Sequence, residues 1–197
     1  MANSADVMID LETTGTSPGC GILSIGACTF DGIFEFYEKI NPTDNFKWRL
    51  ESSMETLAWW NKQDIAAKRE AFSGTKDLVE VLGNFSDYIL RVSRNNGNAE
   101  VFVWGNGADF DNPILAKAYE VVEMKQPWKP YNGRCYRTLK NLYPQIKMEK
   151  FEGMKHNALD DAKMQARHAL AILRERKRQN LIVSEKENQV PQMNIYP

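Results

Sequence analysis

The chain has 197 residues, of which 43% are hydrophobic and 26% are charged. This length and composition are typical of one globular domain and argue against intrinsic disorder. The net charge is −1, from 25 basic and 26 acidic residues, which excludes a protein that coats nucleic acid through a broadly basic surface.

The cysteines and the apolar runs favour a cytoplasmic location. Cys20, Cys28 and Cys135 are odd in number and lack metal-ligand spacing, so we expect reduced thiols. The sequence shows neither a signal peptide nor an apolar run long enough to span a bilayer. We therefore expect a soluble cytoplasmic protein without membrane contact.

The first forty residues predict an antiparallel meander. Strands are expected over 6–11, 21–30 and 33–40, and Asp31-Gly32 gives a hairpin turn between the second and third. Helix-like spacing then alternates with one further buried strand. We expect that strand over 100–104, a loop over 125–133, and helices over 53–70, 75–93, 112–122, 137–143 and 157–179.

This order of elements predicts a single α/β domain over residues 1–183. Residues 184–197 are polar, contain two prolines and are expected to form a loosely ordered C-terminal tail.

Two carboxylates stand at the end of the first predicted strand. Asp10 and Glu12 are one residue apart, so strand alternation sends both side chains to the same face. Carboxylates on one face of a core strand repel each other and are costly to desolvate. A hard divalent cation, which prefers oxygen ligands, is the simplest compensation. The pair therefore predicts a metal site.

Two later clusters carry further acidic groups. Asp109 and Asp111 follow the strand at 100–104 and open a helix, where helix capping alone would explain them. His156 precedes the last helix, whose first turn contains Asp160 and Asp161, and the helix dipole alone would explain those acids. The other histidine, His168, lies mid-helix, and we expect no particular role for it.

The combination of these clusters is more informative than any one of them. Four carboxylates in this order could hold two Mg²⁺ or Mn²⁺ ions, the arrangement that supports in-line attack at phosphorus. A histidine beside them could deprotonate the attacking water, since histidine exchanges protons near neutral pH.

These motifs resemble the DEDDh family of 3′–5′ exonucleases, which includes ribonuclease T, oligoribonuclease and the proofreading exonucleases. The match comprises Asp-Leu-Glu-Thr-Thr-Gly at 10–15, Asp-Phe-Asp at 109–111, and His-x4-Asp-Ala at 156–162, so it covers most of the chain. Segments 56–63 and 134–139 look most like the exodeoxyribonuclease VIII and bacteriophage exonuclease branch. For a phage protein, the location would be the host cytoplasm.

The resemblance implies a ribonuclease H-like fold: a mixed five-stranded sheet, three antiparallel strands first, flanked by helices. It selects Asp111 over Asp109 and Asp161 over Asp160. Hydrolysis of a single-stranded 3′ end to 5′-mononucleotides is implied, as DNA or RNA. A homodimer is compatible with the family. By resemblance, the two ions would be held by Asp10, Glu12, Asp111 and Asp161, with His156 as general base.

Substrate-binding residues are also expected by resemblance. Thr13 would approach the terminal nucleotide, and Thr14 and Thr16 lie in the same motif. Many family members have an apolar wedge, often Leu, where this chain has Thr16. Trp59 could replace it by stacking on a base. We nevertheless expect core packing to be the main role of the Trp59-Trp60 pair. Adjacent residues of a helix point in different directions, so at least one of the two must face inward.

Two other classes of protein fit parts of the pattern. One is a non-catalytic module of the same fold that binds nucleic acid or protein, although such a module need not retain all five catalytic residue types. The other is a structural cation site in an unrelated α/β protein, where the His-x4-Asp spacing would have no role. The sequence therefore favours the exonuclease.

Overall fold

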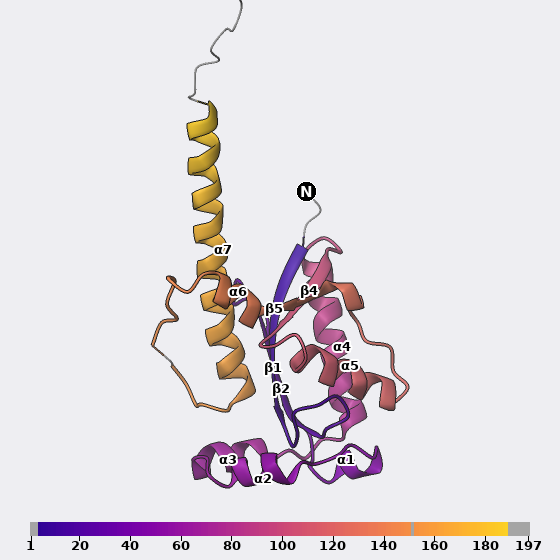
Figure 1. Cartoon of the computed structure of the whole chain (residues 1–197). Coiled ribbons are helices and arrows are strands. Elements are labelled where there is room, and N and C mark those ends of the chain that lie inside the picture. The colour runs from indigo at the N-terminus through magenta and orange to yellow at the C-terminus, as the bar shows by residue number, and fades with distance from the viewer. Residues whose placement is uncertain (1–3, 151, 189–197) are drawn as a thin grey trace, which may run out of the picture.

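A mixed five-stranded sheet forms the centre of the computed structural model, which describes residues 4–150 and 152–188 (Figure 1). Its strand order is β3-β2-β1-β4-β5. The pairs β1–β2 and β2–β3 are antiparallel, whereas β1–β4 and β4–β5 are parallel. The expected mixed sheet, with its three antiparallel strands first, is confirmed. The strands are β1 Ser4–Thr13, β2 Ile22–Thr29, β3 Glu35–Lys39, β4 Glu100–Gly105 and β5 Gly133–Cys135.

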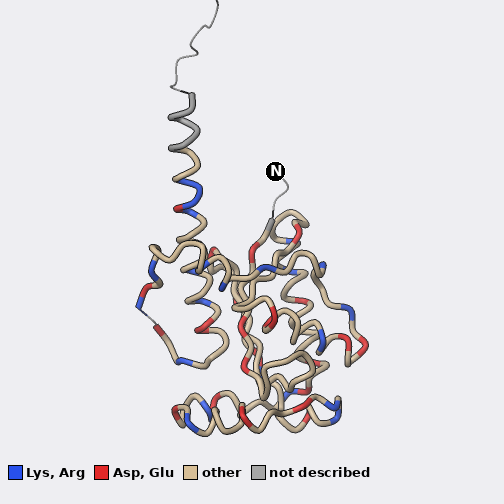
Figure 2. The backbone as a smooth tube through the Cα atoms, viewed as in Figure 1, with Lys and Arg blue, Asp and Glu red and all other residues tan. Residues whose placement is uncertain are grey.

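Helices cover both faces of this sheet and lie beyond the lower ends of its strands in Figure 1. Basic and acidic residues are interspersed along the described part of the chain (Figure 2). The helices are α1 Asp44–Lys47, α2 Met54–Trp60, α3 Ile65–Ala71, α4 Leu78–Asn95, α5 Asp111–Val121, the 3-10 helix η1 Pro130–Asn132, α6 Tyr136–Leu142 and α7 Ala158–Asn188. The strand β5 and the short helices α1 and η1 had no counterpart among the predicted elements.

Two predicted helices have different bounds in the structure. The expected helix over 53–70 is two helices in the structure. The Asp64 side chain accepts a hydrogen bond from the Ala66 amide (2.8 Å) and thereby caps the N-terminus of a separate helix, α3. The last helix continues to Asn188 rather than ending near residue 179. Residues 184–188 of the expected tail are thus helical, and 189–197 lie outside the described residues. The division into a domain and a tail stays a prediction.

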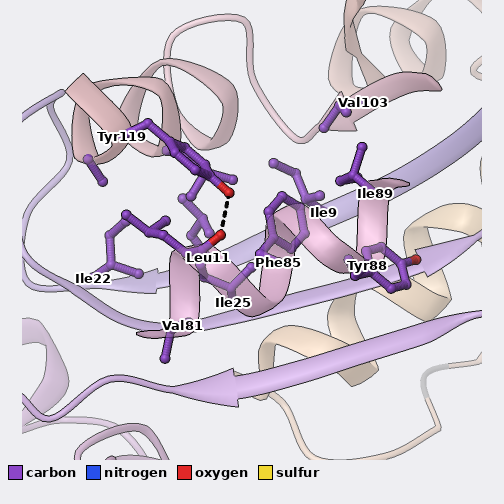
Figure 3. Packing of buried hydrophobic residues seen from close by; sticks show 14 of the residues in the cluster. Ile9, Leu11, Ile22, Ile25, Val81, Phe85, Tyr88, Ile89, Val103 and Tyr119 are labelled. Atoms are coloured by element: carbon purple, nitrogen blue, oxygen red, sulfur yellow. Dashed lines mark hydrogen bonds between the residues drawn. The ribbon is translucent and has the colours of Figure 1, made fainter. Parts of the chain in front are cut away.

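Strand alternation divides the core into two clusters on opposite faces of the sheet. Ile9 and Leu11 point toward α4 and α5, where they pack with Phe85 and Tyr119 (Figure 3). The Tyr119 hydroxyl donates a hydrogen bond to a backbone carbonyl of α4 (2.8 Å), which joins the two helices. Met8 points to the opposite face, into a cluster with residues of α6 and α7. The side chains of residues 10 and 12 therefore also face α7.

His168 has a structural role that we did not expect from the sequence. The residue is 5% exposed, and its Nδ1 shares a hydrogen bond with the Tyr136 hydroxyl (2.7 Å). Its Nε2 lies 2.8 Å from the Ile146 carbonyl oxygen. These contacts fasten α6, and the loop that follows it, to the middle of α7.

All three cysteines are free, as expected, and Cys20 and Cys28 are buried. Within residues 4–150 and 152–188, no helix has both the length and the apolar character needed to cross a membrane.

Candidate active site

The end of β1 places two carboxylates on the face that α7 covers. Glu12 is 7% exposed, and burial, followed by the charges of Asp161 and Asp111, raises its pKa to about 8. The pKa of Asp10 is raised well above its ordinary value, chiefly by burial and then by the negative charges of Asp111 and Glu12. The site therefore holds negative charge at a cost that a bound cation would relieve.

Asp111 joins this pair from the start of α5, immediately beyond β4. It is 1% exposed and accepts hydrogen bonds from the Leu11 amide (3.2 Å) and the Asn106 amide (2.6 Å). Burial raises its pKa to about 6, while these two bonds act in the opposite direction. The bond to β1 fixes Asp111 beside Asp10, whereas the side chain of Asp109 is exposed at the surface.

The first turn of α7 supplies the fourth carboxylate. Asp161 accepts a hydrogen bond from the His156 amide (2.9 Å), and burial is the largest cause of its raised pKa. Its neighbour Asp160 instead accepts from the Met154 amide (2.8 Å) and stabilises the preceding loop. The two adjacent acids thus have different roles, and only Asp161 points into the site.

His156 lies on the loop immediately before α7, with its backbone in the left-handed region (φ 61°). Ligand atoms of Glu12, His156 and Asp161 all lie within 4.8 Å of one another. The structure thus brings together residues from β1 and from a segment more than a hundred positions later. Among the described residues, these three side chains are the one group of possible metal ligands that lies this close together.

Gln165 belongs to the site but was missed from the sequence. Its Nε2 donates a 2.7 Å hydrogen bond to Asp10 Oδ1. Gln165 lies one helical turn beyond Asp161, on the same face of α7, so the spacing could have indicated it. Its Oε1 and the Asn106 Oδ1, both at the pocket, are buried without a hydrogen-bond partner among the described residues.

The donor set fits divalent cations of the Mg²⁺ or Mn²⁺ type. Such ions take carboxylate and water oxygens as ligands, and the site offers four carboxylates from β1, α5 and α7. The two unpaired amide oxygens could accept hydrogen bonds from metal-bound water. Burial is the largest cause of the raised pKa of each of the four carboxyl groups, and a bound cation would favour their charged forms.

A pocket of about 500 Å³ opens above these acids. Trp60 is buried beneath it and donates from its indole nitrogen to the Thr13 carbonyl (2.9 Å), so one of the paired tryptophans faces inward, as expected. Trp59 is 42% exposed and packs edge-on against His156, with ring centres 4.9 Å apart. The pocket lining also includes Glu55, Thr56, Asn106 and Phe110, which sequence reasoning did not indicate.

The predicted threonines occupy different positions around this pocket. Thr13 and Thr16 line it. Thr14 does not: its hydroxyl lies 3.2 Å from the Glu51 carbonyl oxygen and 3.4 Å from that of Gly21, and it is 5% exposed. Thr14 is therefore placed to hold the loop after β1.

Gly26 explains how α7 comes so close to the carboxylates. It lies opposite Asp10 in the β1–β2 register, and a Cβ at this position would be 2.1 Å from the Ala158 carbonyl carbon. The backbone at the start of α7 therefore occupies the space of the missing side chain. Any residue other than glycine would push Asp161 and His156 away from β1.

We expect Gly26→Ala to lower both activity and stability. Overpacking of this kind costs about 1–3 kcal/mol, and the displaced helix start would separate the acids. Thermal unfolding and strand hydrolysis would measure the two effects. Gly83→Ala, at a helical position with nothing within 4 Å of the new Cβ, is the matched control. Unchanged activity in Gly26→Ala would contradict the close approach of α7.

Comparison with protein families identifies the chain. A family model described as the 3′–5′ exoribonuclease Rv2179c-like domain matches residues 5–173. The chain belongs to this family. It is accordingly a 3′–5′ exonuclease, and the resemblance to DEDDh exonucleases is confirmed. We therefore retain the enzyme over the non-catalytic binding module. No curated protein matches the chain significantly.

Solved structures share the fold of this exonuclease at low sequence identity. The nuclease domain of 3′hExo, a DEDDh family member bound to rAMP, is 15% identical over 88% of this chain and 93% of its own (TM-score 0.58). A 3′-exonuclease solved for 3′-end specific recognition of histone mRNA stem-loop is 16% identical over 88% and 64% (TM-score 0.60). Cell-death related nuclease 4 is 11% identical over 89% and 66% (TM-score 0.55). The ribonuclease H-like fold is thereby confirmed.

Proposed function

We propose that this exonuclease hydrolyses single-stranded RNA from its 3′ end and releases 5′-mononucleotides. The observation that carries the proposal is the cluster of Glu12, His156 and Asp161, whose ligand atoms lie within 4.8 Å of one another at a pocket of nucleotide size. RNA is favoured over DNA because the matching family is described as exoribonuclease. Of the structurally similar nucleases, one is bound to rAMP and another recognises a histone mRNA stem-loop, which supports RNA as the substrate.

The proposed roles follow from the position of each side chain. Asp10, Glu12, Asp111 and Asp161 would hold two divalent ions, which supply charge neutralisation and acidify a bound water. His156 removes the proton from the attacking water as general base. Gln165 keeps Asp10 in place through its 2.7 Å hydrogen bond. The amides of Leu11 and Asn106 orient Asp111 in the same way.

The walls of the pocket would bind the terminal nucleotide. Thr13 ends β1 and Thr16 lies in the loop that follows it, and Trp59 offers an exposed indole in the same pocket, next to His156. An indole at this place suits stacking on a base, which holds the 3′ end without sequence readout. The branch within the family, a homodimer and a cytoplasmic location stay predictions.

Trp59→Ala is expected to raise KM for a single-stranded oligonucleotide. Loss of one base–aromatic stack costs about 1–3 kcal/mol, which corresponds to roughly 5–150-fold. Trp59→Phe, which keeps an aromatic ring, should lie much nearer the wild type. Steady-state kinetics on a labelled strand would check both variants. An unchanged KM in Trp59→Ala would show that the base binds elsewhere.

A time course on matched 3′-labelled RNA and DNA, single- and double-stranded, tests the proposed function. We expect mononucleotide release from single-stranded RNA in Mg²⁺ or Mn²⁺, and none in EDTA. Equal or faster hydrolysis of DNA would overturn the substrate proposal. Full activity in EDTA would overturn the two-ion mechanism.

A further inference from the structure

A second pocket, of about 400 Å³, adjoins the candidate active site. Thr16 lines both pockets, and Ser53 in the second is two residues from Glu55 in the first. The second pocket lies between the loop that follows β1 and the segment that follows α1. Because the two pockets share Thr16, a strand that extends past Thr16 from the first pocket would reach the second.

Backbone hydrogen bonds make this second pocket a built feature of the fold. The Gly21 amide donates to the Glu51 carbonyl (2.9 Å), and the Glu51 amide donates to the Gly19 carbonyl (2.9 Å). The Ser53 amide donates to the Thr14 carbonyl (2.8 Å). The loop after β1 and the segment at 49–53 are thus joined at three points.

Arg49 is the unpaired cation of this pocket among the described residues. Its side chain is exposed and makes no ion pair or hydrogen bond with the residues that the structure describes. Lys117 also lines the pocket, but its amine already pairs with Glu120 (2.6 Å). Glu51 also belongs to the lining, and Arg49 supplies the positive charge that is not already paired within the protein.

The backbone conformation of Arg49 is unusual for an arginine. The residue adopts a left-handed conformation (φ 54°) just after α1, a position at which helices usually end with Gly or Asn. The Leu50 amide donates to the Asn45 carbonyl there (3.0 Å), which closes the turn. Glycine would stabilise this turn better than arginine does. The backbone conformation therefore does not account for an arginine at this position.

We propose that the second pocket is a phosphate subsite, in which Arg49 binds an internal phosphodiester of the strand on the 5′ side of the terminal nucleotide. The guanidinium group matches phosphate oxygens in geometry and keeps its charge at all relevant pH values. This inference rests on the proposed function, because the strand must first place its 3′ end in the active site. Arg49 then distinguishes a polynucleotide from a mononucleotide.

The test compares two substrates that differ in their upstream phosphates. The p-nitrophenyl ester of a nucleoside 5′-monophosphate has one nucleotide, whereas a single-stranded decanucleotide also reaches the second pocket. Arg49→Gly should raise KM for the decanucleotide roughly tenfold and leave the ester unaffected. It should also reduce the slope of log(kcat/KM) against log salt by about 0.7 in magnitude, the value for one lost phosphate contact on a single strand.

Matched variants separate this subsite from general electrostatics. Arg94→Ala removes the same charge at the exposed end of α4, beside the start of β4 and thus at the opposite end of the sheet, and should change neither substrate. Arg49→Lys should recover part of the decanucleotide KM. Equal kinetics for Arg49→Gly and Arg94→Ala would overturn the subsite, and so would an equal loss on both substrates. A wild-type protein inactive on both substrates would refute the proposed function instead.

Discussion

Asp10→Asn is expected to abolish hydrolysis of a 3′-labelled single strand in Mg²⁺ while the fold is preserved. Asn has the shape of Asp and can still accept the hydrogen bond from Gln165, but it lacks the charge that a divalent ion needs. Metal-ion catalysis contributes several kcal/mol of transition-state stabilisation, so we expect a loss of at least about 10³-fold. Asp161→Ala should have a similar effect. Gel assays, with circular dichroism to check folding, would measure these results.

The same substitution should stabilise the protein when metal is removed. Asp10 is buried beside Asp111, Glu12 and Asp161, and its raised pKa means that folding disfavours its charged form. A carboxyl of this kind stabilises the fold fully only below its unfolded pKa, and that contribution is lost as the pH rises through its folded pKa. In EDTA, wild-type stability should therefore fall as the pH rises toward the raised pKa of Glu12, about 8. Thermal unfolding should show a smaller fall in Asp10→Asn.

Asp109→Asn provides the control for both effects. Asp109 has the same side chain and lies two residues from Asp111, but it is exposed and outside the pocket lining. We expect near wild-type activity and no change in metal-free stability. Full activity in Asp10→Asn would contradict the two-ion mechanism. Loss of activity in Asp109→Asn would show that Asp109, and not only Asp111, belongs to the active site.

The features that depend on local periodicity could be predicted from the sequence. Alternation alone placed Asp10 and Glu12 on one face of β1, and Asp31-Gly32 indicated the turn before β3, where Gly32 has a positive φ. The choice between Asp160 and Asp161 needed the family resemblance, since both residues suit a first helical turn. The structure shows how the two acids differ, because the carboxylate of Asp160 accepts a hydrogen bond from the Met154 amide and so stabilises the preceding loop.

The features that depend on tertiary packing could not be predicted. No local pattern shows that Gly26 gives α7 its space, because the clash is with backbone 132 positions later, at Ala158. The orientations of the two tryptophans could not be predicted for the same reason. Trp60 is buried and donates a hydrogen bond to the Thr13 carbonyl, whereas Trp59 is exposed at the pocket. The sequence therefore predicts which residues carry the chemistry better than it predicts what holds them in place.

His156 could act on water or bind an ion directly, because its ring nitrogen lies within 4.8 Å of ligand atoms of both Glu12 and Asp161. The two roles predict different kinetics. A general base removes a proton in the rate-limiting step, so its loss lowers kcat without weakening the binding of Mg²⁺. A ligand holds the ion, so its loss raises the Mg²⁺ concentration needed for half-maximal activity. The proposed function requires the first pattern.

We therefore expect His156→Ala and His156→Asn to lower kcat by roughly 10²–10⁴-fold, the usual contribution of a general base, at unchanged Mg²⁺ dependence. Asn is the sharper substitution, because it tolerates the left-handed backbone of residue 156 and so leaves the backbone amide in place to donate its hydrogen bond to Asp161. Added imidazole should restore part of the activity. A decrease of less than tenfold would show that another group activates the water. Recovery at high Mg²⁺ would instead assign His156 to the metal site, because only a ligand's loss can be offset by more ion.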